Sequence, residues 1–223
     1  MALPMPEWLC FDLDGTLVDS VPDITFSLNE MLMQMNLPTV DEGIARTWIG
    51  NGAQKLIHRA LTHVLGAKPE DTIFEQAKAL FFIAYEKNIA VKTVVYPGCM
   101  QILNHFADHG VPLACVTNKP RKFTPPLLEK LAMAHFFRAL VCGDDLETQK
   151  PDPGPVLEAI KCLGGNPAEG YMVGDSETDM AAAKGAGAGA IYVSYGYNRG
   201  VSVEKYQPIC INSLQELLNL FKH

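Results

Sequence analysis

The sequence predicts an α/β fold, in which a parallel-sheet, Rossmann-like core carries an inserted all-α cap domain after its first strand. Short apolar, β-branched or cysteine-containing segments alternate with segments of helical periodicity, a pattern typical of parallel sheets with helical crossovers. The stretch from residue 20 to residue 95 breaks this alternation, because it has helical patterns and no strand signal. Hydrophobic residues make up 48% of the 223-residue chain, enough to bury a core and support a sizeable insertion.

Six segments are expected to be strands. Each is short, apolar and bounded by turn residues, and the last is the weakest: residues 8–13, 112–117, 139–143, 171–174, 190–194 and 209–211. Helical periodicity fills the connections between them, at residues 100–109, 123–131, 155–163 and 180–186. Glycines stand where three of these helices should end. Residues 213–216 form a capping-box pattern that predicts a last amphipathic helix.

Helices account for the inserted stretch. Ser20 is the expected N-cap of the first one, whose apolar positions recur at helical spacing. Thr39 opens a second capping-box pattern, and two further helical stretches follow a glycine-containing turn. Ligands of open α/β sheets bind beyond the carboxyl ends of the strands, and the insertion begins at that edge. We therefore expect residues 20–95 to act as a lid over a core formed by residues 1–19 and 96–223.

Charge and composition argue against several classes of protein. Lysine and arginine number 18 against 25 aspartates and glutamates, a net charge of −7, so no binding to nucleic acid or to an anionic membrane is expected. No lysine or arginine precedes Arg46, which argues against a secretory or transit sequence. No apolar stretch approaches the roughly 18 residues of a membrane span. The six cysteines are scattered without a Cys-x-x-Cys pair, so we expect free thiols and a soluble, cytoplasmic protein.

Two carboxylates, Asp12 and Asp14, follow the first expected strand and precede a glycine. Side chains two residues apart on an extended segment point the same way, so these carboxylates should repel each other. A divalent cation would make the pair tolerable, and so would a proton retained on one of the two. An isolated Asp-x-Asp is more often a solvated turn, so the interpretation depends on the residues at the ends of the other strands.

Polar residues follow the next three strands as well. The hydroxyl of Thr117 and the amide of Asn118 follow the second strand, and Lys150 follows the third in a proline-rich segment. A second acidic pair, Asp175 and Asp179, follows the fourth. Each is ordinary by itself, as a cap, a surface lysine or a turn. Together they place two acidic pairs, a hydroxyl and a lysine at one edge of a parallel sheet. Hard cations take oxygen ligands, and phosphate needs donors and positive charge, so the set predicts a site for Mg²⁺ and a phosphoryl group.

These four segments resemble, in their usual order, the four motifs of the haloacid dehalogenase-type phosphohydrolase superfamily. The insertion after the first of them resembles a helical cap of the first type. Four shorter segments further resemble the bacterial type of phosphoglycolate phosphatase: residues 46–52, 143–145, 150–153 and 195–198. The resemblance covers essentially the whole chain. It implies a phosphoric monoester hydrolase that converts a small phosphate monoester, 2-phosphoglycolate in the narrower case, into an alcohol and phosphate.

The resemblance also implies roles for the motif residues. Asp12 would be the nucleophile that forms an aspartyl-phosphate, and Asp14 would be the general acid and then the general base. Mg²⁺ would be held by four aspartates, Asp14 through its backbone carbonyl and Asp179 directly or indirectly: Asp12, Asp14, Asp175 and Asp179. The phosphoryl oxygens would be bound by a hydroxyl, a backbone amide and an ammonium group: those of Thr117, Asn118 and Lys150.

Substrate choice is expected to lie in the cap. Arg46, or the loop Gly50, Asn51 and Gly52 beside it, would contact the substrate carboxylate, with Lys119 as a second candidate. The ordinary interpretation of the same residues is a surface arginine and a turn between helices. Four other functions stay open at this point: a phosphosugar mutase, a phosphatase of broad sugar-phosphate or nucleotide specificity, a phosphonate hydrolase that uses a cap lysine such as Lys55 as a Schiff-base nucleophile, and a binding protein without catalysis. Monomer and homodimer are equally compatible with the sequence.

Overall fold

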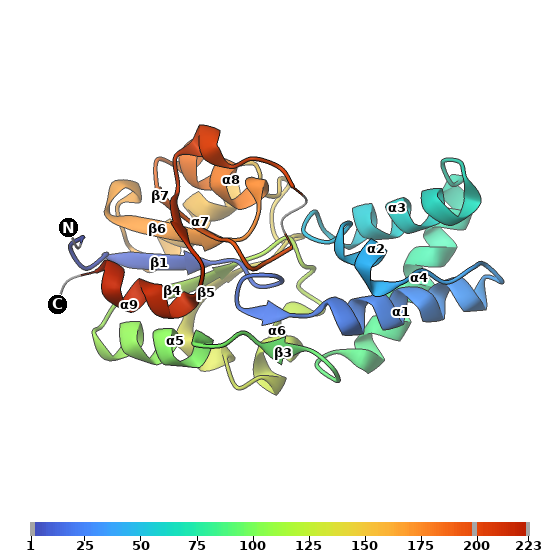
Figure 1. Cartoon of the computed structure of the whole chain (residues 1–223), viewed down its shortest axis with the longest axis horizontal. Coiled ribbons are helices and arrows are strands. Elements are labelled where there is room, and N and C mark those ends of the chain that lie inside the picture. Colours follow the sequence, from blue (N-terminus) through green and yellow to red (C-terminus); the bar gives the residue numbers. More distant parts are fainter. Residues whose placement is uncertain (1–2, 198–199, 222–223) are drawn as a thin grey trace.

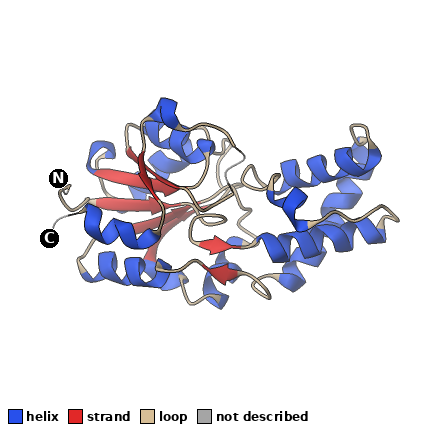
Figure 2. Ribbon diagram, viewed as in Figure 1, coloured by secondary structure: helices blue, strands red, loops and turns tan. Residues whose placement is uncertain are grey.

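The sheet of the computed structural model, which describes residues 3–197 and 200–221, contains the six expected strands (Figure 2). All of its strand pairs are parallel, in the order β5-β4-β1-β6-β7-β8. The strands are β1 (Trp8–Phe11), β4 (Leu113–Val116), β5 (Phe137–Val141), β6 (Gly170–Gly174), β7 (Gly189–Val193) and β8 (Ile209–Ile211). The predicted parallel α/β core is therefore confirmed.

Helices cover both faces of this sheet. They are α5 (Cys99–Asp108), α6 (Thr124–Lys130), α7 (Gly154–Leu163), α8 (Glu177–Ala186) and the short α9 (Leu217–Leu220). Side chains alternate along a strand, so Trp8 and Cys10 of β1 pack with α7 and α8, whereas Leu9 and Phe11 pack with α5 and α9. All four side chains are fully buried. Strands that are apolar along their whole length need to be buried on both faces of the sheet. The polar residues of this region therefore lie beyond the strand ends.

Four helices lie in the inserted stretch of the chain, between β1 and α5. They are α1 (Val21–Gln34), α2 (Glu42–Arg46), α3 (Ala53–Leu65) and α4 (Asp71–Asn88). Figure 1 shows that they lie beside the sheet, at the end toward which β1 runs, rather than on either of its faces. Leu28 and Met31 of α1 share a buried apolar cluster with Phe81 and Tyr85 of α4, and the same cluster continues to Leu9 of the sheet.

An antiparallel ribbon of two very short strands connects the helical unit to the sheet. It pairs β2 (Val18–Asp19) with β3 (Val94–Val95), so the expectation of helices alone up to residue 95 was wrong. Strands of two residues have no measurable periodicity, which is why the sequence did not predict them. The carboxylate of Asp23, in the first turn of α1, accepts three backbone N–H bonds of 2.8–3.0 Å from the second connection, those of Val91, Lys92 and Thr93. The two connections are thereby held together.

Helix starts differ from the expected capping boxes. Asp41, rather than Thr39, caps α2, and its carboxylate accepts the Ile44 N–H at 2.9 Å. A carboxylate also interacts favourably with the helix dipole, which a threonine hydroxyl does not. Ser20 occupies the N-cap position of α1 but makes no capping bond, because its hydroxyl donates to a carboxylate of the core instead. The box at residues 213–216 forms a 3-10 turn, Leu214–Glu216, ahead of α9.

All six cysteines lie in the described part of the chain as free thiols, four of them buried. None of the helices in residues 3–197 and 200–221 combines the length and the apolar character that crossing a bilayer demands.

Candidate active site

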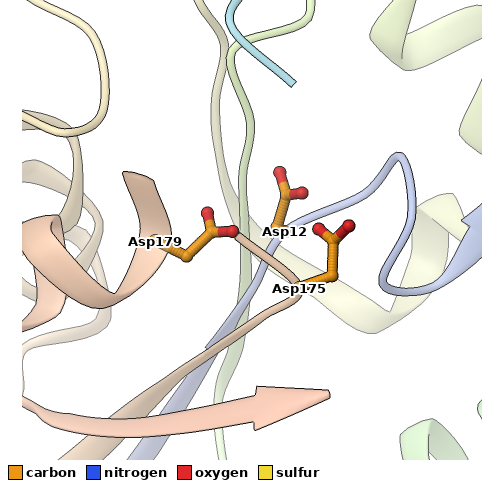
Figure 3. A group of neighbouring side chains, drawn as sticks. All are labelled: Asp12, Asp175 and Asp179. Atoms are coloured by element: carbon orange, nitrogen blue, oxygen red, sulfur yellow. The ribbon is translucent and has the colours of Figure 1, made fainter. Parts of the chain in front are cut away.

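Three aspartates meet at the carboxyl end of the sheet (Figure 3). Asp12 directly follows β1 and Asp175 follows β6, and because these strands are hydrogen-bonded neighbours, their ends lie side by side. Asp179 joins them from the first turn of α8. Carboxylate oxygens of the three residues lie within 4.8 Å of one another, and all three side chains are buried. The sequence expected these residues to converge, and the structure brings them together.

The aspartates are held in an environment that disfavours their negative charge. Burial raises the pKa of Asp12 to about 7, with Lys150 opposing the shift and Asp179 adding to it. Burial also raises the pKa of Asp175 well above its ordinary value, and the neighbouring carboxylates raise it further. Buried oxygen donors that repel one another fit a hard divalent cation, which would relieve this repulsion. The three residues could therefore bind a metal ion.

Lys150 bridges two of the three aspartates. Its ammonium lies 2.8 Å from Asp12 Oδ1 and 2.6 Å from Asp179 Oδ1, and it also donates to the carbonyl oxygen of Val116 at 2.5 Å. Only 3% of the residue is exposed. Burial alone would lower the pKa of this lysine, but the two carboxylates outweigh burial and raise it, so the ammonium stays charged. Its three N–H donors thus match three acceptors.

Neighbouring groups hold the carboxylate of Asp175 in place. The Thr16 hydroxyl donates to Oδ1 at 3.3 Å, and the backbone N–H of Tyr197 donates to Oδ2 at 2.6 Å. Gly15 has a φ of +94°, and a Cβ at this position would lie 2.4 Å from Asp175 Oδ2. Only glycine allows the chain to pass so close to this carboxylate. Asn198, which also belongs to a segment that the sequence singled out, lies outside the described residues.

Asp14 stands apart from the three converging carboxylates. Its two carboxylate oxygens accept from Lys119 Nζ at 3.1 and 3.0 Å, and the Ser20 hydroxyl donates to Oδ1 at 2.5 Å. Each carboxylate of the Asp12–Asp14 pair therefore has its own buried lysine. The expectation for metal binding concerned the backbone carbonyl of Asp14, and it stays a prediction.

A cavity separates this acidic edge from the helical unit. Its floor includes Asp12, Asp14, Thr117, Asn118 and Lys119 from the sheet side. Its roof is mostly apolar, with side chains from α1, α3, α4 and the α2–α3 connection: Ile24, Ile49, Leu56, Phe81 and Tyr85. Water-excluding walls over a polar floor strengthen the electrostatic interactions of any ligand bound between them.

One loop of the helical unit touches the phosphate-binding candidates. The side-chain amide of Asn118 donates to the carbonyl of Gly50 at 3.2 Å and to that of Lys150 at 2.9 Å. Gly50 and Gly52 line the cavity, whereas Asn51 is not among the lining residues and accepts instead from Arg59 at 2.9 Å. The sequence therefore pointed to a loop of which two residues face the site.

Arg46 lies away from this cavity. Its guanidinium pairs with Asp19 at 3.0 Å and with Glu42 at 3.6 Å, and it lies 5.1 Å from the centre of the Tyr197 ring. These contacts join α2 to strand β2 and to the loop that holds Asp175. The suggestion that Arg46 contacts the substrate stays a prediction, and its observed partners favour a role in holding the helical unit against the core.

Sequence reasoning gave no functional role to two residues of the site: Ser20, whose hydroxyl donates to Asp14, and Tyr85, which lines the cavity. Tyr85 sits on the apolar face of a helix, where the pattern is that of a core residue. Ser20 had the signature of a helix cap. Only the hydrogen bonds of the folded chain distinguish such residues from ordinary packing and capping.

Comparison with known proteins gives consistent matches. A family model described as haloacid dehalogenase-like hydrolase matches residues 9–193. A phosphoglycolate phosphatase of Nitrosococcus oceani is 40% identical over 219 residues, which are 98% of this chain and 97% of that protein. Phosphoglycolate phosphatase 1 of Pseudomonas aeruginosa is 42% identical, over 97% of this chain and 80% of that protein. The structure of a predicted phosphoglycolate phosphatase from Haemophilus somnus has a TM-score of 0.91 and 33% identity, and the match covers 97% of this chain and 98% of that one.

Proposed function

The chain belongs to the haloacid dehalogenase-like hydrolases, and from this premise we propose that it is a Mg²⁺-dependent phosphatase that hydrolyses 2-phosphoglycolate to glycolate and phosphate. The observation that supports this most directly is the placement of Asp12: it is buried beside Lys150 and two further aspartates, at the floor of a cavity. The near-full-length similarity to phosphoglycolate phosphatases supports the substrate.

Asp12 is the proposed nucleophile. A carboxylate oxygen attacks phosphorus, the bond between phosphorus and the ester oxygen breaks, and an aspartyl-phosphate forms. Lys150 holds one oxygen of Asp12 at 2.8 Å and so orients the carboxylate for attack. The Thr117 hydroxyl, the backbone amide of Asn118 and Lys150, one of whose N–H donors leaves its present acceptor, bind the phosphoryl oxygens. Bound Mg²⁺ supplies positive charge that neutralises the transferring group.

Asp14 is the proposed general acid and base. In the first step it gives a proton to the departing glycolate oxygen, and in the second it takes a proton from the water that attacks the aspartyl-phosphate. Phosphate then leaves, and both aspartates return to their starting states. Lys119 and Ser20 hold the Asp14 carboxyl group at the cavity, on the side where the leaving group would lie.

The metal ion would be bound by the carboxylates of Asp12 and Asp175 and by the backbone carbonyl of Asp14. Asp179 would bind it directly or through a water molecule. The helical unit, residues 20–95, would serve as the lid that excludes water from the reaction. We place the activity in the cytoplasm, because Cys162 and Cys210 are exposed as free thiols.

Mg²⁺ binding should depend on pH. The metal-free site keeps protons on Asp12 below its pKa of about 7, and these must leave before the carboxylate can bind the ion. We expect the affinity to fall by up to about tenfold per pH unit between pH 7 and pH 5.5. Calorimetric titration of EDTA-treated protein, in buffers of different ionisation enthalpy, measures both the affinity and the proton release. An affinity that stays constant over this range would contradict the assignment.

Stability of the metal-free protein should show the opposite trend. A carboxyl group with a raised pKa favours the folded state at low pH, and this contribution is lost as pH rises through about 7. Urea unfolding in EDTA should therefore give a lower midpoint at pH 8 than at pH 6.

Phosphate release tests the proposed reaction. We expect 2-phosphoglycolate to be preferred over a panel of sugar and nucleoside monophosphates, and we expect EDTA to abolish release. A broad preference with the same metal dependence would keep the phosphatase and reject the named substrate. A sugar phosphate isomer formed without inorganic phosphate would identify a mutase. If no compound on the panel is turned over with metal present, the hydrolase proposal is wrong.

A further inference from the structure

Tyr85 brings an unsatisfied hydroxyl group to the enzyme's cavity. The residue is 2% exposed, lies in α4 and lines the cavity, yet none of the described residues accepts a hydrogen bond from its hydroxyl, because the polar group beside it, the Lys119 ammonium, can only donate. Its ring is fixed, since it stacks on Phe81 with centroids 5.7 Å apart and meets Phe123 edge-on at 5.0 Å. One other described side chain, that of Thr25, has such a buried and unpartnered atom, and it does not line the cavity.

A buried cation lies next to this tyrosine. The side chain of Lys119 is 4% exposed, and its ammonium is 4.6 Å from the centre of the Tyr85 ring. Among the described residues that line the cavity, Lys119 is the only one with a basic side chain. The ammonium contacts the two oxygens of Asp14, and Asp14 and the neighbouring Tyr85 hydroxyl raise its pKa, so it stays charged. A cation and a free hydroxyl on a common apolar wall are the donors that a small carboxylate needs.

We propose that Tyr85 and Lys119 form the subsite that binds the carboxylate of the substrate, and that this pair selects 2-phosphoglycolate among small phosphate monoesters. The inference rests on the proposed function and deepens it. It assigns specificity to a cap tyrosine and a core lysine that meet only when the helical unit covers the sheet. The carboxylate accepts one bond from the Tyr85 hydroxyl and one from the Lys119 ammonium.

The neighbours of Tyr85 suit this role. Burial raises the pKa of the Tyr85 hydroxyl to about 12, against the opposing effect of the Lys119 ammonium, so at neutral pH the hydroxyl keeps its proton and can donate it to a carboxylate. Lys119 also holds Asp14, the proposed acid for the departing oxygen. In 2-phosphoglycolate one carbon separates that oxygen from the carboxylate, so both ends of the leaving group reach the same lysine. Arg46, paired with Asp19 outside the cavity, is not needed.

The test compares two substrates that differ in the carboxylate. In Tyr85→Phe we expect the ratio of kcat/KM for 2-phosphoglycolate to kcat/KM for ethyl phosphate to fall about tenfold or more, the usual effect of losing a bond to a charged group. Lys119→Gln should lower the same ratio at least as far. Tyr171→Phe is the matched control, because this tyrosine lies in β6, packs against Phe221 and does not line the cavity. It should leave the ratio unchanged.

Binding without turnover separates this inference from the proposed function. Calorimetry on Asp12→Asn, alone and combined with Tyr85→Phe, compares the Kd values of 2-phosphoglycolate and ethyl phosphate. The tyrosine substitution should remove about tenfold of the preference for 2-phosphoglycolate. A ratio that changes less than about twofold in kinetics and in binding overturns the carboxylate subsite, even if 2-phosphoglycolate is hydrolysed. Failure of the wild-type enzyme to hydrolyse 2-phosphoglycolate overturns the proposed function, and the calorimetric ratio still decides the subsite.

Discussion

Asp12→Asn is expected to reduce phosphate release from 2-phosphoglycolate by about 10⁴-fold or more, because an amide cannot form the aspartyl-phosphate. Neither neighbouring aspartate can replace Asp12 as the nucleophile. Asp175 is held in place by Tyr197 and Thr16, and Asp179 is held by Lys150. Initial rates of phosphate release at saturating Mg²⁺ measure the effect.

The same substitution should leave the fold intact. Burial raises the pKa of Asp12 to about 7, so its carboxylate opposes folding at higher pH, and a neutral amide removes this cost. Lys150 keeps its bonds to Asp179 and to Val116. At pH 8 in EDTA the urea midpoint should equal or exceed that of the wild type. Asp108→Asn, at an exposed position in α5, is the control with the same chemical change. Residual activity above about 1% would contradict the role of Asp12 as nucleophile.

Lys150→Met should both inactivate and destabilise the protein. It removes the cation that lies 2.8 Å from Asp12 and 2.6 Å from Asp179, and it leaves buried carboxylates without a partner. Breaking a buried ion pair in this way costs about 3–5 kcal/mol in the free energy of unfolding. Urea unfolding of the EDTA-treated protein measures the loss. Saturating Mg²⁺ should restore part of it, since a bound cation replaces some of the missing positive charge.

Two comparisons make this result specific to the buried site. Lys161→Met removes a lysine whose side chain is 78% exposed and should change the unfolding free energy by less than about 0.5 kcal/mol. The double variant Asp12→Asn with Lys150→Met should be less destabilised than Lys150→Met alone, because one of the unpaired charges is gone. A loss below about 1 kcal/mol in Lys150→Met would show that the lysine does not hold these carboxylates together.

Much of the fold followed from local pattern. The strands of the sheet are short apolar runs separated by helical repeats, and such alternation favours a parallel sheet almost independently of tertiary detail. The ribbon of β2 and β3 did not follow, because two residues per strand carry no pattern. The N-cap residue of α2 is Asp41 rather than the predicted Thr39, because both side chains can cap a helix and they lie within three residues of each other.

The polar floor of the site was also predictable in outline. Parallel strands deliver their carboxyl ends to one edge, so a polar residue after each strand must approach the others. Lys150 and Asp12 are 138 residues apart in the chain and 2.8 Å apart in space for this reason. The partners of Arg46 were not predictable. An arginine in the helical unit can contact either the substrate or a carboxylate of the protein. Nothing in the sequence around Arg46 indicates that its partner is Asp19.

The sequence by itself determined the parallel core, the position of the helical insertion and the residues that gather at the strand ends, since periodicity and strand direction are local properties that the chain encodes directly. The tertiary structure alone decided which lysine contacts which aspartate, that Arg46 pairs with Asp19 of β2, and that Tyr85 lines the cavity with a hydroxyl that no described residue accepts from. These choices depend on how the helical unit packs over the sheet. That packing is set by contacts between segments far apart in the chain, which no local pattern specifies.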